Sequence, residues 1–416
     1  MVKIKPFKGL RPLPEHAQKV ASPPYDVLSS VEAREMASTN PHSFLHVVKP
    51  EIDLPGDTDP YSDVVYAKAK ENLEKLINDH VMKQEDKDSY YLYQIQMGDH
   101  IQTGLVTVAS VDDYTEGRIK KHEFTRPAKE DDRTKHILTS KAQAGPVFCV
   151  FRADPELRKI FDELTNDPPE FNFTADDGIR HTLWVIKNPE HTNSITRAFE
   201  GFDAIYIADG HHRSAAGTRA AGKYRELNPN YNGNEEFNYF LTVIFPDDEM
   251  KILPYNRVVK DLSGMSEQGF MEKLRSKFDI TNAASKDEAE PKNNYEYGMF
   301  LDGQWYRLKA QDSIIDRTDP VESLDVQVLA QNVLKPLLKI EDPRTDPRID
   351  FVGGIRGLKE LEKLVNSGEW KVAFALYPTS IEQLLSVADA GKVMPPKSTW
   401  FEPKLRSGMV VHLLEE

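Results

Sequence analysis

The sequence predicts a mixed α/β or α+β fold, in which several sheets carry flanking helices. Residues 89–111 alternate in the manner of two paired strands, and residues 205–222 join an apolar strand to an Ala-rich helix. Residues 350–378 run as a strand, a Gly-rich turn, a helix and a strand, which is typical of a βαβ unit. Strands and helices alternate throughout the chain, without an internal repeat, and this mixture indicates the fold class.

The N-terminal part opens with Pro-punctuated extended chain before its first helix. Ser29 or Ser30 is placed to cap that helix, and a second helix is expected near residues 61–81. The strands within residues 89–111 predict a β-hairpin. We expect a polar loop at residues 121–133, followed by a helix and an apolar strand.

The middle of the chain continues this alternation. The Asp177-Gly178 pair predicts a hairpin between short strands, and a helix at residues 191–202 leads into the strand that ends at Asp209. Residues 286–294, KDEAEPKNN, are the most linker-like stretch, and they are either a linker or a loop inside a domain.

A chain of 416 residues has room for two or three domains. We expect an N-terminal α+β region at residues 1–155, a central region at residues 156–262 and a C-terminal α/β region at residues 263–416. The first carries the PPYD and KHEFTRPAKEDDR segments, and the second carries the ADGHHR motif.

The composition is that of a globular protein, with 39% hydrophobic and 29% charged residues. A net charge of −14 argues against nonspecific nucleic-acid binding, which needs clustered Lys and Arg. The single Cys149 forms no intrachain disulfide, which fits a reducing compartment. Without an apolar run long enough to span a bilayer or an apolar N-terminal signal, we expect a cytoplasmic protein with no membrane partner. The sequence indicates no oligomeric state.

The strongest candidate site is Asp209, Gly210, His211, His212 and Arg213, where a strand ends and a helix begins. Free backbone N–H groups and the helix dipole favour a bound anion there. Asp209 could hold Mg²⁺ or orient a nucleophile, the histidines could exchange protons near neutral pH, and Arg213 could grip a phosphate. Alternatively, Asp209 caps the helix, one histidine packs and Arg213 forms an ion pair. A cap needs only the Asp, so the run beside it favours function.

Two other interpretations of this region are weaker. A zinc site is disfavoured because adjacent His211 and His212 point to different sides, with no Cys or helical His pair nearby to complete a tetrahedral set. Residues 217–224, GTRAAGKY, match a phosphate-binding loop except that Tyr224 stands where Ser or Thr is needed. We expect that stretch to be helix interior and C-cap.

A second candidate is the segment KHEFTRPAKEDDRTKH, residues 121–136. Its mixed charges could bring a carboxylate base and phosphate-binding cations together, although a solvated charged loop has a similar composition. The candidate acids are Glu123 and Glu130, and the candidate phosphate- or nucleotide-binding residues are His122, Thr125, Lys129 and Arg133.

A third candidate is SPPYDV, residues 22–27, where two prolines present Tyr25 and Asp26 just before a helix. A structural corner would look the same. Weaker candidates are the Gly-rich turn at residues 353–357, the group Tyr255, Asn256 and Arg257, and the group Asp176, Asp177 and His181.

Several ordered motifs together resemble the family called domain of unknown function 1015. They are VASPPYDVLS, NPHSFLHVVKPE, KHEFTRPAKEDDRTKH, YIADGHHRSAAG, ILPYNRVV and MPPKSTWFEPKLRSGMVVH, and they cover nearly the whole chain. The family name implies no activity.

The ADGHHR run is also similar to the Asp-Gly-His-His-Arg motif of free serine kinases of the ParB/sulfiredoxin-like fold. This resemblance implies a ParB/sulfiredoxin-like core and the phosphorylation of free L-serine from a nucleotide with Mg²⁺. It implies that Asp209 assists the serine hydroxyl or the metal, while His211, His212 and Arg213 hold phosphate. A further acid would serve as the base, with Glu123, Glu130 and Asp26 as candidates.

We therefore expect a small-molecule phosphotransferase, a kinase with an alcohol acceptor that makes O-phospho-L-serine from L-serine. Mg²⁺ and ADP or ATP would be its cofactors, and the small substrate and the nucleotide its partners. Two alternatives are a phosphohydrolase acting on phosphoserine or a related ester, and a non-catalytic nucleotide-binding regulator. The phosphohydrolase would use His211 or His212 to activate water or as the nucleophile.

Overall fold

The structure is a computed structural model that describes residues 1–415 and divides into two compact units. The first unit is Met1–Met250 together with the segment that begins at Pro403, and the second is Lys251–Glu402. Each unit contains a sheet with helices packed on it, so the predicted mixed fold is confirmed. The three-part division of the sequence stays a prediction, and the two units are described separately.

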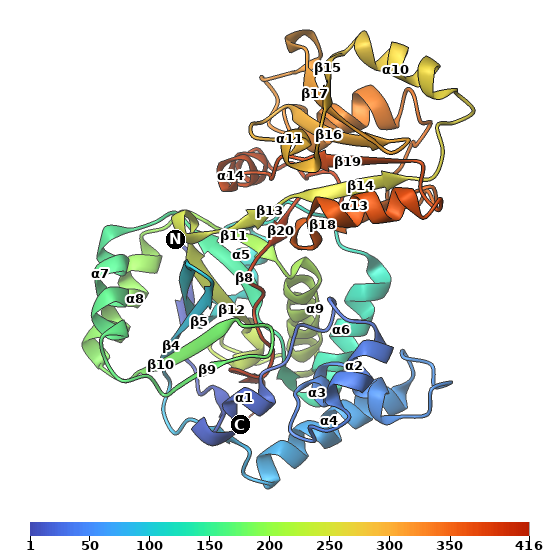
Figure 1. Cartoon of the computed structure of the whole chain (residues 1–416). Helices are drawn as coiled ribbons and strands as arrows, with labels where there is room; N and C mark the ends of the chain where they lie inside the picture. The colour runs from blue at the N-terminus through green and yellow to red at the C-terminus, as the bar shows by residue number, and fades with distance from the viewer. Residues whose placement is uncertain (416) are drawn as a thin grey trace. The chain divides into compact units, whose positions relative to one another are not determined.

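The first unit is built on a nine-stranded sheet with the order β6-β11-β8-β12-β5-β4-β10-β9, and β1 pairs with β5 beside this path (Figure 1). The sheet is mixed, because β8 pairs parallel with β12 and antiparallel with β11. Its strands are β1 Ile4–Lys5, β4 Tyr90–Met97, β5 His100–Ser110, β6 Ile119–Lys120, β8 Val147–Phe151, β9 Phe171–Thr174, β10 Arg180–Ile186, β11 Ile205–Asp209 and β12 Tyr239–Pro246.

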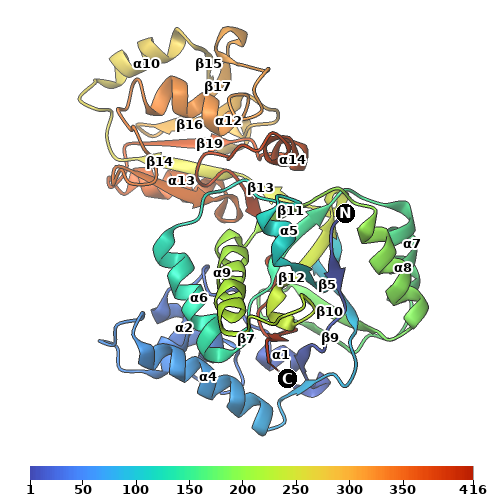
Figure 2. The ribbon, with the colours of Figure 1, turned by 180° about the vertical axis from the view of Figure 1, so that it is seen from behind.

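Helices cover both faces of this sheet. Figures 1 and 2 show α7 and α8 on one side and α9 with α6 on the other, with α4 packed against α6. The helices are α1 Ala17–Val20, α2 Ser30–Ala37, α3 Leu45–Val48, α4 Asp63–Asn78, α5 Val111–Thr115, α6 Pro127–Ser140, α7 Pro155–Thr165, α8 Pro189–Glu200 and α9 His211–Leu227. Single 3₁₀ turns are formed by η1 Pro14–His16, η2 Pro50–Asp53, η3 Glu236–Asn238 and η4 Asp247–Glu249.

Several local predictions for this unit are confirmed. Ser29 caps α2 in a reciprocal capping box with Glu32. β4 and β5 form the predicted hairpin, as do β9 and β10. Gly178 in the second hairpin turn has φ of +79°, a conformation that glycine adopts without strain.

Two expectations for this unit are wrong. Residues 127–133 are helical rather than part of a loop. Pro127 occupies the first position of α6, where the backbone N–H that proline lacks has no partner within the helix, and Ile137 on the inner face of α6 is buried. The GTRAAGKY stretch lies inside α9, as expected, but Gly222 is not its C-cap. The helix continues to Leu227 and is capped at Asn228.

The second unit has a six-stranded sheet with the order β15-β17-β16-β19-β14-β18 and a small ribbon of β13 and β20. Its strands are β13 Ile252–Leu253, β14 Tyr255–Val259, β15 Phe278–Ala283, β16 Glu296–Leu301, β17 Gln304–Ala310, β18 Ile349–Gly353, β19 Val372–Leu376 and β20 Trp400–Phe401. Its helices and turns are α10 Glu267–Arg275, α11 Lys286–Ala289, η5 Asp312–Ile314, α12 Asp325–Leu329, the π-helical turn η6 Ala330–Leu334, η7 Gly354–Arg356, α13 Gly357–Asn366 and α14 Ile381–Asp389.

The predicted strand-helix-strand unit at the end of the chain is confirmed as β18, α13 and β19. Both strands pair antiparallel with β14, which lies between them, so β18 and β19 are parallel to each other. The linker-like residues 286–294 lie inside this unit and include α11.

Residues 403–415, which we call the strap, tie the end of the described chain to the first unit. Ser407 exchanges backbone hydrogen bonds with Ser22, and Val411 does the same with Leu10. Its strand β21, His412–Leu413, pairs with β7, Ala142–Gln143. A further ribbon joins β2, Leu10–Pro12, to β3, Met82–Gln84.

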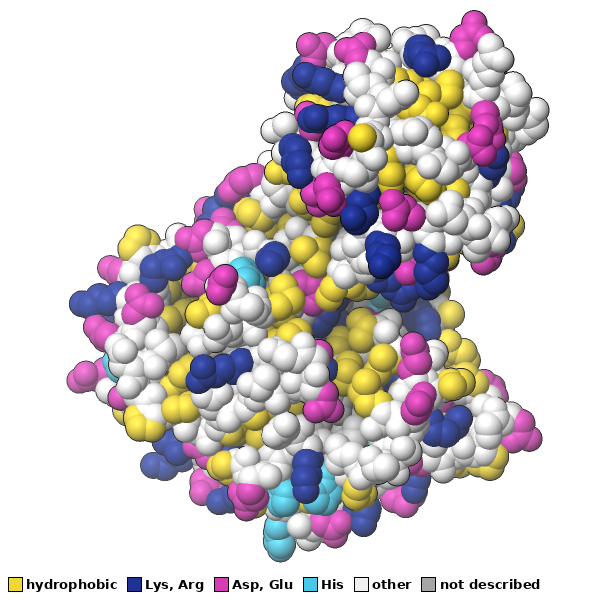
Figure 3. Space-filling view, in the orientation of Figure 1, with side chains coloured by type: hydrophobic (Ala, Val, Ile, Leu, Met, Phe, Trp, Pro, Cys, Tyr) yellow, Lys and Arg dark blue, Asp and Glu magenta, His cyan; other side chains and the backbone are white. Residues whose placement is uncertain are grey.

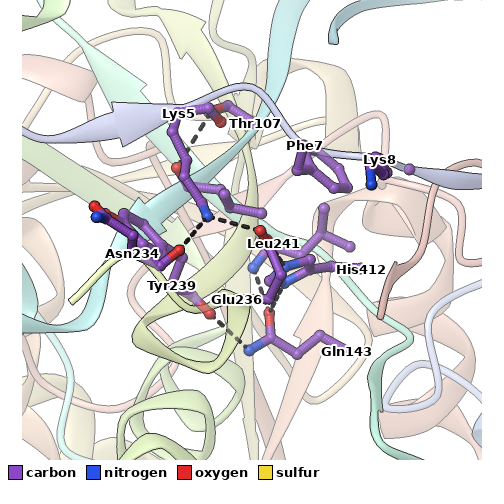
Figure 4. Close-up of polar contacts among 12 residues, drawn as sticks. Lys5, Phe7, Lys8, Thr107, Gln143, Asn234, Glu236, Tyr239, Leu241 and His412 are labelled. Carbon is purple, nitrogen blue, oxygen red and sulfur yellow. Dashed lines mark hydrogen bonds and ion pairs between the residues drawn. The ribbon is translucent and has the colours of Figure 1, made fainter. Parts of the chain in front are cut away.

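A buried polar network anchors the strap at His412 (Figure 4). The Gln143 amide is fixed in orientation, because its Oε1 accepts from the N–H of Leu241 and its Nε2 donates to the carbonyl of Tyr239. Nδ1 of His412, 3.2 Å from that Oε1, must therefore donate. Nε2 of the same ring lies 2.7 Å from Oε2 of Glu236, so these two atoms share a proton. Burial lowers the pKa of His412, and the contact with Glu236 opposes this shift.

The pairing of Glu236 extends this network to the first strand of the chain. Oε1 of Glu236 lies 2.7 Å from Nζ of Lys5, so the Glu236 side chain contacts both Lys5 and His412. The β1 strand and the strap are thereby held by the same carboxylate.

The exposed face in Figure 3 carries acidic and basic side chains interspersed over each unit. Among the described residues, no helix is both long and apolar enough to cross a membrane.

We predict that the first unit loses stability as the pH falls below about 6.5, because it buries histidines in neutral form. Burial lowers the pKa of His122 and His136 to about 4 and that of His181 to about 3, whereas an unfolded chain would bind the proton near 6.5. Stability is therefore complete above the unfolded value and decreases by about 1.4 kcal/mol per pH unit for each such histidine.

Urea unfolding between pH 7.5 and 4.5 measures this slope. His181→Gln should reduce it by about one proton, since the amide does not titrate. The matched change at an exposed position, His80→Gln, should leave it as in the wild type. Equal slopes for wild type and His181→Gln would contradict the prediction.

Candidate functional site

The candidate site of the first unit is built where β11 ends and α9 begins. The pairing of β11 with β8 changes register between Ile207 and Asp209, an irregularity that redirects the last side chain of the strand. Gly210 follows with φ of +95° as the N-cap of α9. A Cβ at Gly210 would lie 3.0 Å from Nε of Arg213, so glycine is required both by the backbone and by the close approach of the arginine.

Asp209 carries a carboxylate paired with two cations. Its Oδ2 lies 2.8 Å from Nζ of Lys404, and its Oδ1 lies 3.6 Å from a guanidinium nitrogen of Arg213. Burial raises the pKa of Asp209, but Lys404 and Arg213 outweigh burial and hold it well below its usual range. Asp209 is therefore an anion at any physiological pH and a poor proton acceptor.

Arg213 connects this strand end to the SPPYDV segment. Its Nη2 lies 3.6 Å from Oδ2 of Asp26, the same distance as from Asp209, and its Nη1 donates to the carbonyl of Pro146. The side chain is 10% exposed, and its Nε is buried without a hydrogen-bond partner among the described residues. A buried guanidinium with an unused donor is suited to an anionic ligand.

His211 and His212 both use Nε2 as an acceptor toward the loop before α6. Nε2 of His212 accepts from the N–H of Arg126 at 3.0 Å, and Nε2 of His211 accepts from the N–H of His122 at 3.4 Å. Burial lowers the pKa of both histidines. Each is therefore a neutral imidazole that carries its hydrogen on Nδ1, and each is a donor on that side.

The first half of the KHEFTRPAKEDDR segment adjoins these histidines. The ring of His122 packs edge-on against that of His211, with centroids 4.5 Å apart. Oε2 of Glu123 lies 3.9 Å from Nδ1 of His211, and the Glu123 side chain is 48% exposed. Three sequence segments predicted separately thus meet at the start of α9.

The second half of that segment is engaged elsewhere on α6. Glu130 accepts a hydrogen bond from Thr125 and pairs with Arg219 at 3.3 Å. Lys129 donates to the hydroxyl of Tyr61 at 3.3 Å. Thr125, Lys129 and Glu130 therefore make contacts that do not involve Asp209 or Arg213.

Arg133 lies on the inner face of α6, over the ring of Tyr25 at 4.2 Å from its centroid and 2.8 Å from Asp132. Burial, with a contribution from Asp26, raises the pKa of Tyr25 to about 12. Tyr25, Arg133 and Arg213 line a cavity of about 40 Å³, whose walls also include Ile137 and Phe240. This cavity brings two buried guanidinium groups to one space beside the strand end.

The weaker candidates have structural explanations. His181 is fully buried between the hydroxyl of Tyr93, at 2.8 Å from Nδ1, and Arg406, which pairs with Asp177. In the second unit, a Cβ at Gly353 would lie 2.9 Å from the ring of Trp400, so close packing accounts for this glycine of the turn.

Arg257 is also buried, and it donates to the carbonyls of Tyr255, Pro396 and Lys397. Burial lowers the pKa of Arg257 to about 10. It clamps the segment before β20 within the second unit.

Metal ligands are sparse around Asp209. Within residues 1–415 there is no group of three or more His, Cys, Asp or Glu side chains arranged to hold a metal ion. Asp209 and Asp26 each place a carboxylate oxygen 3.6 Å from Nη2 of Arg213.

Comparison with known proteins places the chain in a family. Residues 4–327 match the family described as "Protein of unknown function (DUF1015)". The chain belongs to this family. The resemblance indicated by the ordered sequence motifs is thereby confirmed, and no curated protein matches the chain.

Solved structures with distant similarity include a free serine kinase in complex with AMP, at 12% identity and a TM-score of 0.34, which covers 73% of this chain and 91% of that chain. A conserved hypothetical protein from Pyrococcus furiosus has 17% identity and a TM-score of 0.34, covering 74% and 95%. C-terminally truncated SbnI from Staphylococcus aureus has 10% identity and a TM-score of 0.38, covering 73% and 85%. TM-scores this low do not establish a shared fold.

Sequence analysis missed Lys404 as a site residue. It is 195 positions from Asp209, and its pairing depends on the path of the strap. Lys404 could have been found from the sequence FEPKLRSG, because this sequence lies within one of the motifs that resemble the family.

We predict opposite effects of two Gly→Ala substitutions at the start and in the interior of α9. Gly210→Ala should lower the free energy of unfolding by about 1–2 kcal/mol, because alanine is strained at φ of +95° and its Cβ would press on Arg213. Gly222→Ala, where a Cβ meets nothing within 4 Å, should raise it by up to about 1 kcal/mol. Denaturant unfolding measures the free energy of unfolding of both variants. A Gly210→Ala variant as stable as the wild type would contradict the described N-cap.

Proposed function

We propose that the protein is a nucleotide-dependent phosphotransferase that phosphorylates the hydroxyl group of a small acceptor, with free L-serine as the first acceptor to test. The observation that supports the proposal most is the convergence of Asp209, Arg213 and Lys404 at the start of α9, beside two neutral histidines. The resemblance of the ADGHHR motif to that of free serine kinases supplies the donor, ADP or ATP, and the acceptor.

Phosphoryl transfer depends on positioning and on charge stabilisation, because the transferred group is highly charged and needs little covalent help. Arg213 offers a buried donor, and the first N–H groups of a 17-residue helix point to the same end. His211 and His212 add two neutral Nδ1–H groups that can donate hydrogen bonds to phosphate oxygens. These groups together would hold the phosphates of a nucleotide.

Mg²⁺ is the metal that we propose for this site. It is usually held by one or two carboxylates together with substrate phosphates, and Asp209 and Asp26 would fill that role here. Bound there, Mg²⁺ would neutralise charge on the phosphates. Asp209 itself would act as an anchor rather than as a base, because its pKa is held low.

Glu123 is the acid that we propose as the base for the acceptor hydroxyl. It is partly exposed and lies next to His211, so an acceptor beside the helix start would be within its reach. Glu130 is engaged by Thr125 and Arg219, and Asp26 faces Arg213. Glu123→Gln should therefore reduce turnover more than Glu130→Gln.

The tautomers of the histidines argue against the phosphohydrolase alternative. A histidine nucleophile or base needs an unprotonated ring nitrogen that faces the phosphate. In both His211 and His212 the unprotonated nitrogen is Nε2, which accepts from a backbone amide.

We predict that ¹⁵N NMR of histidine-labelled protein at pH 7.5 shows both residues as neutral Nδ1–H tautomers. His211→Asn and His212→Asn spectra would assign the two signals. An Nε2–H pattern for either ring would contradict the assigned donor role.

We predict that ³¹P NMR of the protein with Mg²⁺, L-serine and ADP or ATP shows a phosphoserine signal. Asp209→Asn should reduce its formation by at least about 100-fold, since an electrostatic anchor of the transition state is lost. Asp203→Asn, the matched change at an exposed position six residues upstream, should leave the rate unchanged.

A phosphoserine-only tube distinguishes the alternatives. Free phosphate there would indicate a phosphohydrolase. Nucleotide binding without turnover in any tube would indicate a regulator, and activity of Asp209→Asn equal to that of the wild type would refute the assignment of the site.

A further inference from the structure

The strap carries Lys404 to the start of α9 by a path that is fixed at several points. Ser407 is paired with Ser22 in both directions, at 3.1 and 2.8 Å. Gly408, with φ of +86°, packs so closely that a Cβ would lie 2.7 Å from the ring of Phe44. Beyond it, His412 is held in the buried network with Gln143 and Glu236. The strap therefore cannot slide along the first unit without breaking these contacts.

Lys404 differs from a solvent-exposed surface lysine in its burial and in its contact with the site. Its side chain is 21% exposed and its Nζ lies 2.8 Å from Asp209. An ammonium group offers three donors, so one lysine can contact a carboxylate oxygen and a phosphate oxygen at the same time. Asp209 also faces Arg213, so both cations adjoin the same carboxylate.

We propose that Lys404 is a phosphate-binding residue of the phosphotransfer site, delivered to it by the strap. This inference rests on the proposed function for the identity of the ligand. Lys404 contacts a nucleotide phosphate directly and shares Asp209 with Arg213, so the two cations grip the phosphate from two sides. The site is then complete only when the strap is docked.

A purely structural role for Lys404 predicts a different outcome. In that case the lysine only neutralises Asp209, and its removal would weaken anion binding because the Asp209 carboxylate then repels the phosphate. A direct contact and neutralisation of Asp209 can be separated in a double-mutant cycle, since only the direct contact persists once Asp209 has lost its charge.

The experiment is isothermal titration calorimetry, in which ADP is titrated into the full-length wild type, Lys404→Met, Asp209→Asn and the double variant. Lys404→Met should raise the dissociation constant by about tenfold or more, as expected for a charge-assisted hydrogen bond. The increase should persist in the Asp209→Asn background. Loss of the effect in that background would overturn the proposal, because Lys404 would then act only through Asp209.

Lys141→Met is the matched control, because Lys141 follows α6 and contacts the strap at a different point. Lys141 pairs with Glu415 at the other end of the strap, so the variant removes the same charge and one strap contact. It should bind ADP as the wild type does, and Lys404→Arg should keep most of the affinity. Equal weakening by Lys141→Met and Lys404→Met would show that strap docking, not a phosphate contact, sets the affinity.

Binding and turnover fail in different ways. If ADP binds with the predicted dependence on Lys404 but no phosphoserine forms, the proposed function fails and the phosphate-binding role stands. If phosphoserine forms but Lys404→Met changes neither ADP affinity nor rate, the proposed function stands and the role of Lys404 is refuted. If neither ADP nor ATP binds to the wild type, both fail.

Discussion

The carboxylate of Asp209 is the constraint on which the site depends. It lies partly buried at the end of β11, with 30% of its side chain exposed, and Lys404 and Arg213 supply its positive partners. Because these partners come from the strap and from α9, the carboxylate of Asp209 contacts two segments that are distant in the sequence. The cations brought in to balance Asp209 are the same groups that an anionic ligand would use.

The elements around this point were predictable where local chemistry determines them. The strand that ends at Asp209, the hairpins and the capping box at Ser29 follow from alternation, turn residues and side-chain caps. The start of α6 at Pro127 was missed because the charged residues after it were interpreted as part of a polar loop. Proline at the first helical position carried the correct signal.

The residues that surround Asp209 and Arg213 were less predictable from the sequence than these two residues themselves. The ADGHHR motif identifies Asp209 and Arg213, but nothing local to SPPYDV says that Asp26 lies 3.6 Å from that arginine. The position of Lys404 follows from pairing with Ser22, Leu10 and Gln143, contacts that a single sequence does not specify. Conversely, Thr125 and Lys129 looked suited to phosphate binding and Glu130 to the role of the base. Thr125 and Glu130 instead contact each other, Glu130 also pairs with Arg219, and Lys129 contacts Tyr61.

The histidines show how backbone contacts can decide chemistry. A His-His pair beside an acid is compatible with proton transfer, nucleophilic attack or hydrogen-bond donation. Two backbone N–H groups of the loop before α6 occupy Nε2 of both rings, so donation from Nδ1 is the role that remains. The same two bonds hold the loop that carries Glu123 against the start of α9. Movement of that loop would therefore change the position of the proposed base and the protonation pattern of the donors together, which links acceptor activation to phosphate binding.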